Sequence, residues 1–227
     1  MILEHYNNLP LYKFEHLNEE KNILHFITTR KREKPCLSFN LGYNSGDAHA
    51  IVFQNRNKLA EILQIDLTQL IFQKQVHGIN IAEIYEPNKD LTEIAYTDGL
   101  ITNRKKILLC VKAADCVPLI FYDDEKKVCA VAHAGWKGTF LRIAKKMIEK
   151  MKADFSCNPQ NIKVGIGPSA GPDNYEVGLD IVTKFRESFT NSSLFIIQKN
   201  DKYFLNLWEC NKMQLIESGL AEKNIEI

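Results

Sequence analysis

The chain has 227 residues, 45% of them hydrophobic and 25% charged, so it is long enough to bury a substantial core. Its 29 basic and 28 acidic side chains leave a net charge of +1, which gives no electrostatic reason to expect a nucleic-acid or membrane partner. No run reaches the ~18 consecutive apolar residues of a membrane helix, and the first residues lack a secretory-signal pattern. The six scattered cysteines, without a CxxC pair, therefore predict reduced thiols in a cytoplasmic protein.

In chain order, the pattern first predicts a strand over residues 24–29 and a charged loop over 30–34. Asp47 is then the expected N-cap of a helix that ends near Leu63, and Asp98 is expected to form a turn with the glycine that follows it. The other helices are expected over residues 139–151, 177–189 and 207–218, the last one stopped by Gly219. The other strands are expected over residues 70–76, 79–85, 100–102, 107–111, 117–122, 127–133, 162–166 and 194–198.

The order of these elements indicates the fold class. Residues 117–122 and 127–133 flank a polar turn and predict a β-hairpin, and residues 139–151 form the clearest amphipathic helix. Because strands outnumber helices and often follow one another directly, we expect an α+β fold with mixed β-sheets layered between outer helices. The chain shows no repeat or linker, so residues 1–227 are predicted to form a single domain.

Two polar residues interrupt the apolar face of the first long helix. Asn55 and Arg56 lie three and four positions after Val52, where the helical repeat places core-facing residues. An arginine at such a position extends its charged end to solvent, reaches a buried partner or faces a ligand. The sequence pattern leaves these alternatives open.

Three short motifs carry most of the chemistry in the sequence: Gln-Val-His-Gly around His77, Ala-Asp-Cys ending at Cys116, and His-Ala-Gly-Trp-Lys-Gly beginning at His133. Two imidazoles and one thiol form a complete three-ligand set for a zinc ion with an open fourth position. The three residues lie far apart, each at the end of a different predicted strand, unlike the closely spaced ligands of structural zinc sites. They predict an active metal site. The alternatives are a metal-free pair of Cys116 and His133, or separate packing in the core.

Several neighbouring residues are candidate contacts for a substrate. Asp115, beside Cys116, is expected to orient a histidine, to accept a hydrogen bond from a substrate, or to cap a turn. The glycine-rich junction that contains Lys137 leads from a strand into a helix and indicates an anion site for phosphate or a carboxylate. A second glycine- and proline-rich loop, residues 165–172, precedes Tyr175, which either contacts a ligand or packs in the core.

These segments, in this order, resemble the YfiH-type family, whose members have been called laccase-domain or multicopper polyphenol oxidoreductases and purine nucleoside phosphorylases. The resemblance extends along nearly the whole chain, and the Ala-Asp-Cys and His-Ala-Gly-Trp-Lys-Gly-Thr blocks are its most specific parts. The other matching segments are Asn40-Leu41-Gly42, Asn55-Arg56, Gln75-Val76-His77-Gly78, Thr97-Asp98-Gly99, Gly167-Pro168 and Tyr175-Glu176-Val177.

The resemblance implies a zinc ion held by His77, Cys116 and His133, with copper the less expected metal. It implies phosphorolysis of adenosine, inosine or guanosine to the base and ribose 1-phosphate, with methylthioadenosine phosphorolysis and adenosine deamination as related activities. It also suggests mixed sheets between helices, similar to a cysteine-hydrolase fold. The expected partners are therefore purine nucleosides and phosphate, and the expected assembly is a monomer or a small homo-oligomer.

The residues predicted to bind substrate are Asn40, Arg56, Lys137 and Tyr175. The residues predicted to act in catalysis are Cys116, His133 and Asp115. Within this interpretation, Arg56 and Lys137 bind phosphate, and Asp115 transfers a proton to the leaving base. The alternatives are a metal-free amidase acting on a peptidoglycan precursor, a copper-dependent phenol oxidase, and a binding module without catalysis.

Two departures from the family pattern stand out. Ser169 occupies a position in the Gly-Pro loop where relatives commonly have cysteine, so no role for a second thiol is carried over. Relatives also carry a C-terminal segment containing Phe-Phe-Ser-Tyr-Arg-Arg, which has no counterpart in this sequence. We therefore expect one YfiH-type catalytic domain over residues 1–227 that lacks the phosphate- or substrate-binding arginines of that segment.

Overall fold

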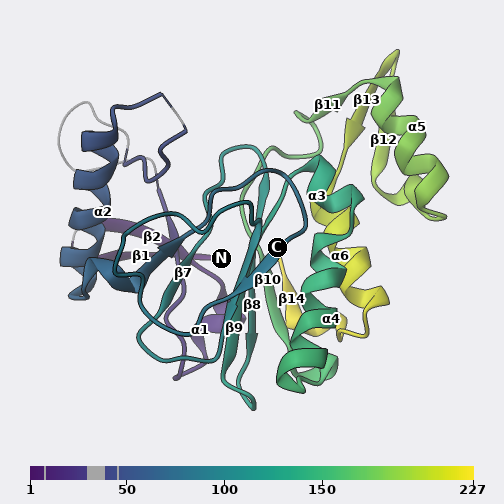
Figure 1. Ribbon diagram of the computed structural model, residues 1–227. Helices are drawn as coiled ribbons and strands as arrows, with labels where there is room; N and C mark the ends of the chain where they lie inside the picture. Colours follow the sequence, from purple (N-terminus) through teal and green to yellow (C-terminus); the bar gives the residue numbers. More distant parts are fainter. Residues whose placement is uncertain (8, 30–38, 45) are drawn as a thin grey trace.

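The computed structural model describes residues 1–7, 9–29, 39–44 and 46–227, so the loop expected over 30–34 lies outside the described residues. The centre of the fold is a six-stranded sheet in the order β14-β10-β8-β9-β6-β5 (Figure 1). Its strands are β5 (Ile81–Glu83), β6 (Gly99–Thr102), β8 (Val117–Asp123), β9 (Val128–Ala134), β10 (Lys163–Ile166) and β14 (Ile225–Glu226). The β5–β6 and β10–β14 pairs are parallel and the others antiparallel, which confirms the predicted mixed sheet.

Strands β8 and β9 form the predicted hairpin in the middle of this sheet. Every residue of β8 is buried, because structure covers both faces of the sheet. Leu119 and Phe121 pack in the cluster on the helical side, whereas Ile120 and Tyr122 pack in the cluster on the opposite side. A strand that is buried on both faces needs apolar residues at successive positions, and this strand has them.

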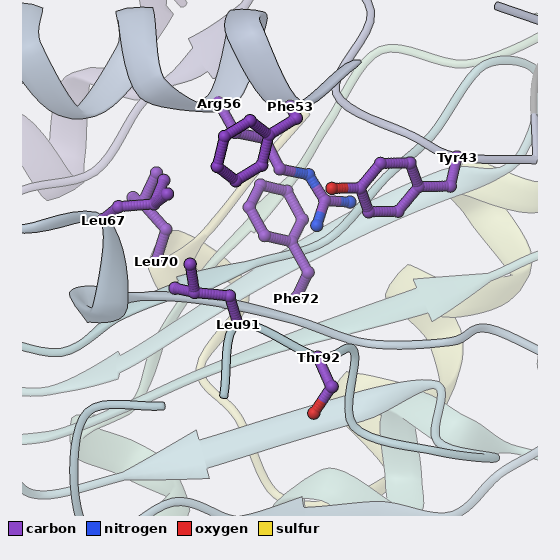
Figure 2. A pocket seen from close by; sticks show the side chains of 8 residues that line it. All are labelled: Tyr43, Phe53, Arg56, Leu67, Leu70, Phe72, Leu91 and Thr92. Carbon is purple, nitrogen blue, oxygen red and sulfur yellow. The ribbon is translucent and has the colours of Figure 1, made fainter. Parts of the chain in front are cut away.

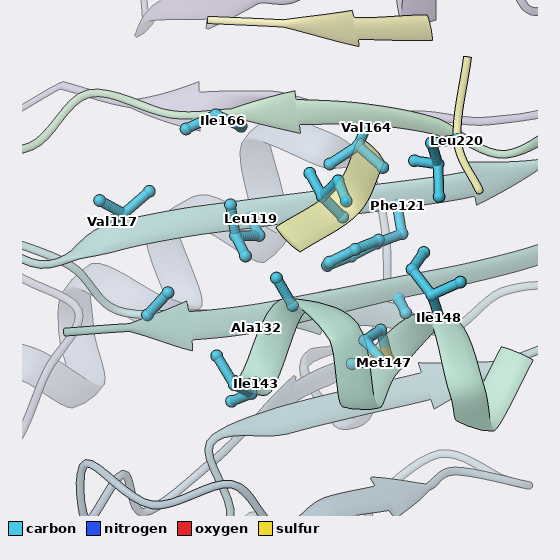
Figure 3. Close-up of a cluster of buried hydrophobic side chains, with 14 of the residues drawn as sticks. Val117, Leu119, Phe121, Ala132, Ile143, Met147, Ile148, Val164, Ile166 and Leu220 are labelled. Carbon is cyan, nitrogen blue, oxygen red and sulfur yellow. The ribbon is translucent and has the colours of Figure 1, made fainter. Parts of the chain in front are cut away.

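Three helices cover one face of the sheet: α3 (Trp136–Phe140), α4 (Ile143–Phe155) and α6 (Leu207–Glu217) (Figure 1). Met147 and Ile148 on the buried side of α4 pack against Leu119 and Phe121 of β8 (Figure 3). Gly219 follows α6 with a φ of 96°, a left-handed conformation that suits glycine and ends the helix as predicted.

The prediction of one continuous helix over residues 139–151 is wrong, because α3 and α4 are separate. Between them, Arg142 has a left-handed φ of 65°. The carbonyl oxygen of Thr139 accepts a hydrogen bond from Nε2 of Gln214 (2.9 Å), and its hydroxyl accepts one from Nδ2 of Asn211 (3.0 Å). Gln214 of α6 therefore binds a backbone carbonyl oxygen, and Asn211 binds the hydroxyl of the same residue, at the point where the chain turns.

Two smaller sheets and helix α2 (His49–Leu63) lie on the opposite face of the six-stranded sheet (Figure 1). One sheet pairs β4 (Leu70–Phe72) with β7 (Leu108–Cys110), and the other contains β1 (Ile2–Tyr6), β2 (Leu9–Lys13) and β3 (Ile27–Thr28), with α1 (Glu15–Asn18) after β2. Leu59 of α2 packs against Leu70 and Phe72 of β4 in a second buried cluster. The layered arrangement of mixed sheets between outer helices is thus confirmed.

The predicted N-cap of α2 is wrong. Ala48 occupies the cap position without a side-chain hydrogen bond. The carboxylate of Asp47 instead accepts a hydrogen bond from Nδ2 of Asn40 at 2.8 Å. Asp47 does not cap the helix because its carboxylate binds Asn40, which lies earlier in the chain.

The remaining elements form a small antiparallel sheet, upper right in Figure 1, in the order β11 (Glu176–Val177), β13 (Lys202–Leu205) and β12 (Ile196–Lys199), with α5 (Leu179–Ser188) beside it. The helix predicted over 177–189 begins two residues later, because Glu176 and Val177 pair with β13. Among the residues described, none of the helices combines the length and apolar character needed to span a bilayer.

Candidate metal centre

The register of the central hairpin brings Cys116 and His133 together. Cys116 directly precedes β8, and the first residues of β8 pair with the last residues of β9, Val117 with Ala134 and Pro118 with His133. Because a hairpin returns the chain to the edge from which it started, residues at these two positions meet at one end of the sheet. The Cys116 and His133 side chains lie within hydrogen-bonding reach of each other.

His77 reaches the same end of the sheet through β5 and β6. Gly99 of β6 pairs with Ala132 of β9, so Asp98 lies next to His133, whose backbone N–H donates to the Asp98 carbonyl oxygen at 2.7 Å. Strand β5 pairs in parallel with β6, and the loop before β5 carries His77. His77 has a left-handed φ of 58°, a conformation that costs a residue with a Cβ about 1–2 kcal/mol.

The three predicted ligands converge in the structure. One potential ligand atom from each of His77, Cys116 and His133 lies within 4.8 Å of the other two. The two imidazole rings meet edge to face, with centroids 4.8 Å apart and an interplanar angle of 77°. His133 is 3% exposed and Cys116 is half-buried, whereas His77 is exposed, so the group is accessible from one side.

Two glycines give these side chains the room that they need. A Cβ atom at Gly135 would lie 2.8 Å from Sγ of Cys116 and 3.1 Å from Cδ2 of His77. A Cβ atom at Gly138 would lie 3.2 Å from the carbonyl oxygen of His133. Gly135 has no room for a side chain because Cys116 occupies that space, and a side chain at Gly138 would press on the backbone of His133.

Asp98 is fully buried at the base of the centre. Its carboxylate accepts hydrogen bonds from the backbone N–H groups of Val76, His77 and Gly78, and Oδ1 lies 2.9 Å from Nδ1 of His133. The sequence pattern assigns this residue only to a turn. The feature of the sequence that could have identified Asp98 as a site residue is its place in the Thr-Asp-Gly segment, which matches the family pattern and directly precedes a buried strand.

Asp115 does not take the role of orienting a histidine. It is exposed, and among the described residues no hydrogen bond joins its carboxylate to a histidine. Its carbonyl oxygen accepts a hydrogen bond from the N–H of Ala170 at 3.0 Å, which holds the glycine- and proline-rich loop beside the centre. A role for its carboxylate in proton transfer stays a prediction.

The neighbouring groups shift the pKa values of both histidines. Burial alone lowers the pKa of His133, but hydrogen bonds with Asp98 and Cys116 outweigh it and raise this pKa to about 9. Burial alone raises the pKa of Asp98, but hydrogen bonds from His133 and the backbone outweigh it and leave this pKa below its usual value. Burial, His133 and Lys137 lower the pKa of His77. His77 is therefore readily neutral, the form in which imidazole binds a metal ion.

The donor set fits a single metal ion. Two imidazole nitrogens and one thiolate are typical ligands of zinc centres that have three protein ligands. Imidazole and thiolate also suit copper, so the donors support a metal centre without deciding between these metals. The Asp98 carboxylate on Nδ1 of His133 is the type of contact that commonly orients a metal-binding histidine.

Lys137 and Tyr175, two of the predicted substrate-binding residues, lie beside the centre. Lys137 is exposed and close enough to His77 to lower the pKa of that imidazole. Tyr175 is partly buried, and burial together with the nearby Cys116 and Asp115 raises its pKa. Both side chains thus lie near the candidate ligands, and binding of a substrate by either one stays a prediction.

Arg56 lies in a separate cluster. Its guanidinium packs between the rings of Tyr43 and Phe72, at 4.2 and 3.7 Å from their centroids (Figure 2). Nη2 of Arg56 and Nζ of Lys112 each lie 2.6 Å from Oε1 of Glu93. Arg56 thus reaches a partly buried partner, which is closest to one of the alternatives left open by the sequence. A pocket beside it is lined by Tyr43, Phe53, Arg56, Leu67, Leu70, Phe72, Leu91 and Thr92.

Asn40 belongs to the same side of the molecule as Arg56. Its Oδ1 accepts a hydrogen bond from the N–H of Gly42 (2.8 Å), and its carbonyl oxygen accepts one from Nδ2 of Asn55 in α2 (2.9 Å). In the part of the chain that the structure describes, no hydrogen bond, ion pair or ring contact joins Asn40 or Arg56 to the three donors. Binding of substrate by these two residues stays a prediction.

A mixed α+β fold with a His/Cys/His centre at one end of its main sheet defines a class of candidate metalloproteins. Residues 24–227 match the family described as multi-copper polyphenol oxidoreductase laccase, and the chain belongs to this family. The resemblance to the YfiH-type family that the motifs indicate is thereby confirmed.

Named relatives and solved structures agree with this family. The chain is 33% identical to a purine nucleoside phosphorylase, YlmD, of Bacillus subtilis over 91% of this chain and 78% of the relative. It is 30% identical to an adenosine deaminase from an unknown prokaryotic organism, over 96% of this chain and 87% of the relative. The crystal structure of the hypothetical protein YfiH of Bacillus licheniformis is 31% identical and superposes with a TM-score of 0.81, covering 97% of this chain and 82% of that one.

Proposed function

We propose that this protein is a zinc-dependent purine nucleoside phosphorylase whose centre is formed by His77, Cys116 and His133. The observation that carries the proposal is the convergence of these three donors in a member of a family with relatives named purine nucleoside phosphorylase. The donor set supports zinc, and the exposed edge of His77 supports access of a small molecule. We further propose that residues 1–227 form one catalytic domain that acts in the cytoplasm.

In phosphorolysis, an oxygen of phosphate forms a bond to C1′ of the ribose while the bond from C1′ to the purine nitrogen breaks. The purine leaves and takes up a proton, and the other product is ribose 1-phosphate, or 5-methylthioribose 1-phosphate from methylthioadenosine. Bound zinc would supply Lewis acidity at the three donors. Lys137 beside the centre is the proposed phosphate contact, Tyr175 the proposed contact for the base, and Asp115 the proposed source of the proton. The proposed substrates are adenosine, inosine, guanosine and methylthioadenosine.

The test incubates the full chain with each nucleoside, with and without phosphate, and separates the products by chromatography. The expected result is release of purine and the corresponding pentose 1-phosphate only when phosphate is present. Release of base without phosphate, or no release at all, would refute the proposal. His77→Ala should abolish both bound metal and turnover, whereas His5→Ala, which removes an exposed imidazole of β1, should leave both unchanged.

A second proposed activity at the same centre is adenosine deamination, supported by the relative named adenosine deaminase. Water would replace the amino group of adenosine, and the products would be inosine and ammonia. The measurement is ammonia release from adenosine in the absence of phosphate. His77→Ala should remove it together with phosphorolysis, because both activities use one centre.

The contact between Cys116 and His133 supports one alternative, a metal-free Cys–His amidase in which Cys116 attacks and His133 is the base. Iodoacetamide distinguishes the two, because zinc should protect a coordinated thiolate and leave a free nucleophile reactive. The family description supports another alternative, a copper phenol oxidase. The residues described contain one group of three donors, His77, Cys116 and His133. A laccase binds several copper ions and needs more ligands than this group supplies. Oxygen uptake with a phenol after copper loading would support that alternative.

A further inference from the structure

We propose that Asp98 is the positioning residue of this centre, and that its single carboxylate fixes both the turn that carries His77 and the ring orientation of His133. This inference rests on the proposed metal centre and not on the nucleoside reaction. It concerns a residue that binds no metal itself. It predicts that the arrangement of the donors depends on a carboxylate at position 98.

The carboxylate joins two segments that are distant in the sequence. Its Oδ1 lies 3.0 Å from the backbone nitrogen of His77 and 2.9 Å from Nδ1 of His133. Its Oδ2 lies 3.1 Å from the backbone nitrogen of Val76 and 2.7 Å from that of Gly78. Three successive N–H groups thus point to one side chain, and the left-handed φ of His77 makes this possible.

Each oxygen of Asp98 faces two nitrogen atoms. The three backbone nitrogens can only donate hydrogen bonds. Nδ1 of His133 also faces the ionised carboxylate, which can only accept, so this nitrogen forms a hydrogen bond only if it carries a proton. An ionised carboxylate accepts all four hydrogen bonds, whereas an asparagine amide has one acceptor oxygen and one donor nitrogen. In one orientation, the NH₂ group of an asparagine would face the N–H groups of Val76 and Gly78. In the other, it would face the N–H of His77 and, in the tautomer that binds metal through Nε2, the N–H at Nδ1 of His133. The site therefore requires a carboxylate and not only a polar side chain of that shape.

The same geometry determines which nitrogen of His133 faces the centre. With the proton on Nδ1 held by Asp98, the lone pair lies on Nε2, the nitrogen on the far side of the ring. The side chain of Cys116 is the other hydrogen-bonding partner of this ring. Asp98 therefore directs the Nε2 lone pair of His133 towards the other two donors.

The first experiment compares Asp98→Asn with Asp123→Asn in the full chain. Asp123 is also fully buried, and its carboxylate accepts a hydrogen bond from the N–H of Lys126 (3.0 Å). It is the last residue of β8, whereas Cys116 directly precedes the first, so Asp123 lies at the opposite end of the strand from the centre. Zinc affinity is measured by competition with a chromophoric chelator, folding by circular dichroism, and geometry by the absorption spectrum of the cobalt-loaded protein. Asp98→Asn should fold, bind zinc about 10–100-fold more weakly and change the cobalt spectrum, whereas Asp123→Asn should leave both unchanged.

Zinc affinity of Asp98→Asn within about twofold of the unchanged protein would overturn the proposal. Equal weakening by Asp123→Asn would overturn it too, because the effect would then reflect general stability. If Asp98→Asn does not fold, long-range ¹H–¹⁵N correlation in the unchanged zinc-loaded protein decides. The proton of His133 should be on Nδ1, and an unprotonated Nδ1 would refute the role of Asp98. If the unchanged protein shows no phosphorolysis but Asp98→Asn still binds zinc more weakly than Asp123→Asn, the proposed reaction is refuted. The role of Asp98 is then still supported.

Discussion

Replacement of Gly135 by alanine tests the geometry of the centre most directly. The new Cβ would lie 2.8 Å from Sγ of Cys116, far inside ordinary contact distance, and 3.1 Å from Cδ2 of His77, which is a tight contact. Contacts between such atoms relax at about 3.5–4.0 Å, so the cysteine sulfur or the loop must move by roughly 1 Å. Metal–ligand distances tolerate only about ±0.2 Å, so a shift of this size removes a ligand from its position.

We expect Gly135→Ala to weaken zinc binding by about 10–100-fold, equivalent to about 1.4–2.7 kcal/mol. The backbone contributes little to this loss, because Gly135 has a φ of −69°, which alanine adopts without strain. The assay is zinc competition with a chromophoric chelator, with the thermal unfolding midpoint measured in parallel. Weaker zinc binding should accompany a fold that circular dichroism shows to be intact.

Gly178→Ala is the matched control. Gly178 is also the N-cap of a helix, with a φ of −72°, and its new Cβ would meet the carboxylate of Asp180, which can rotate away. This variant should keep the zinc affinity of the unchanged protein. Unchanged affinity in Gly135→Ala, or an equal loss in both variants, would show that Gly135 does not border a metal centre.

Three further predictions concern other groups. Burial lowers the pKa of His25 to about 4 from 6.5, so the neutral ring stabilises the fold. The free energy of unfolding should therefore fall between about pH 6.5 and pH 4, and urea denaturation of His25→Gln should show a smaller fall; an equal fall contradicts this. Glu93→Gln leaves the buried Arg56 and a neighbouring lysine without their shared carboxylate and should cost about 3 kcal/mol in chemical denaturation, whereas less than ~1 kcal/mol would show the charges are solvated. Asp115→Asn alters an exposed side chain and should lower kcat for phosphorolysis with zinc affinity unchanged; an unaltered kcat excludes proton transfer by Asp115.

Local patterns predicted the central hairpin and most of helix α4. The apolar runs of β8 and β9 and the polar turn between them identified the central hairpin, because both faces of these strands are covered. The amphipathic stripe of α4, with Met147 and Ile148 on the buried side, was equally clear. In these segments the environment of each residue follows from its neighbours in the sequence.

Distant contacts explain the errors. The break between α3 and α4 depends on Gln214, which lies in α6 and binds the carbonyl oxygen of Thr139. The prediction of Asp47 as the N-cap of α2 is wrong because its carboxylate accepts a hydrogen bond from Asn40. Short strands such as β11 and β14 have two residues each and gain their identity only by pairing with another strand. A local pattern carries no information about such partners.

The same distinction separates the two aspartates of the site. Asp115 is a candidate for orienting a histidine because it is next to Cys116 in the sequence, but it lies in a bend before β8 and is exposed. Asp98 is remote in sequence from His133, yet the pairing of β6 with β9 places it beside that residue. The sequence could identify the candidate metal ligands by their chemistry, because each is a strong donor in a specific motif. The residue that orients them could be identified only from the register of the strands, since its role arises from what it faces.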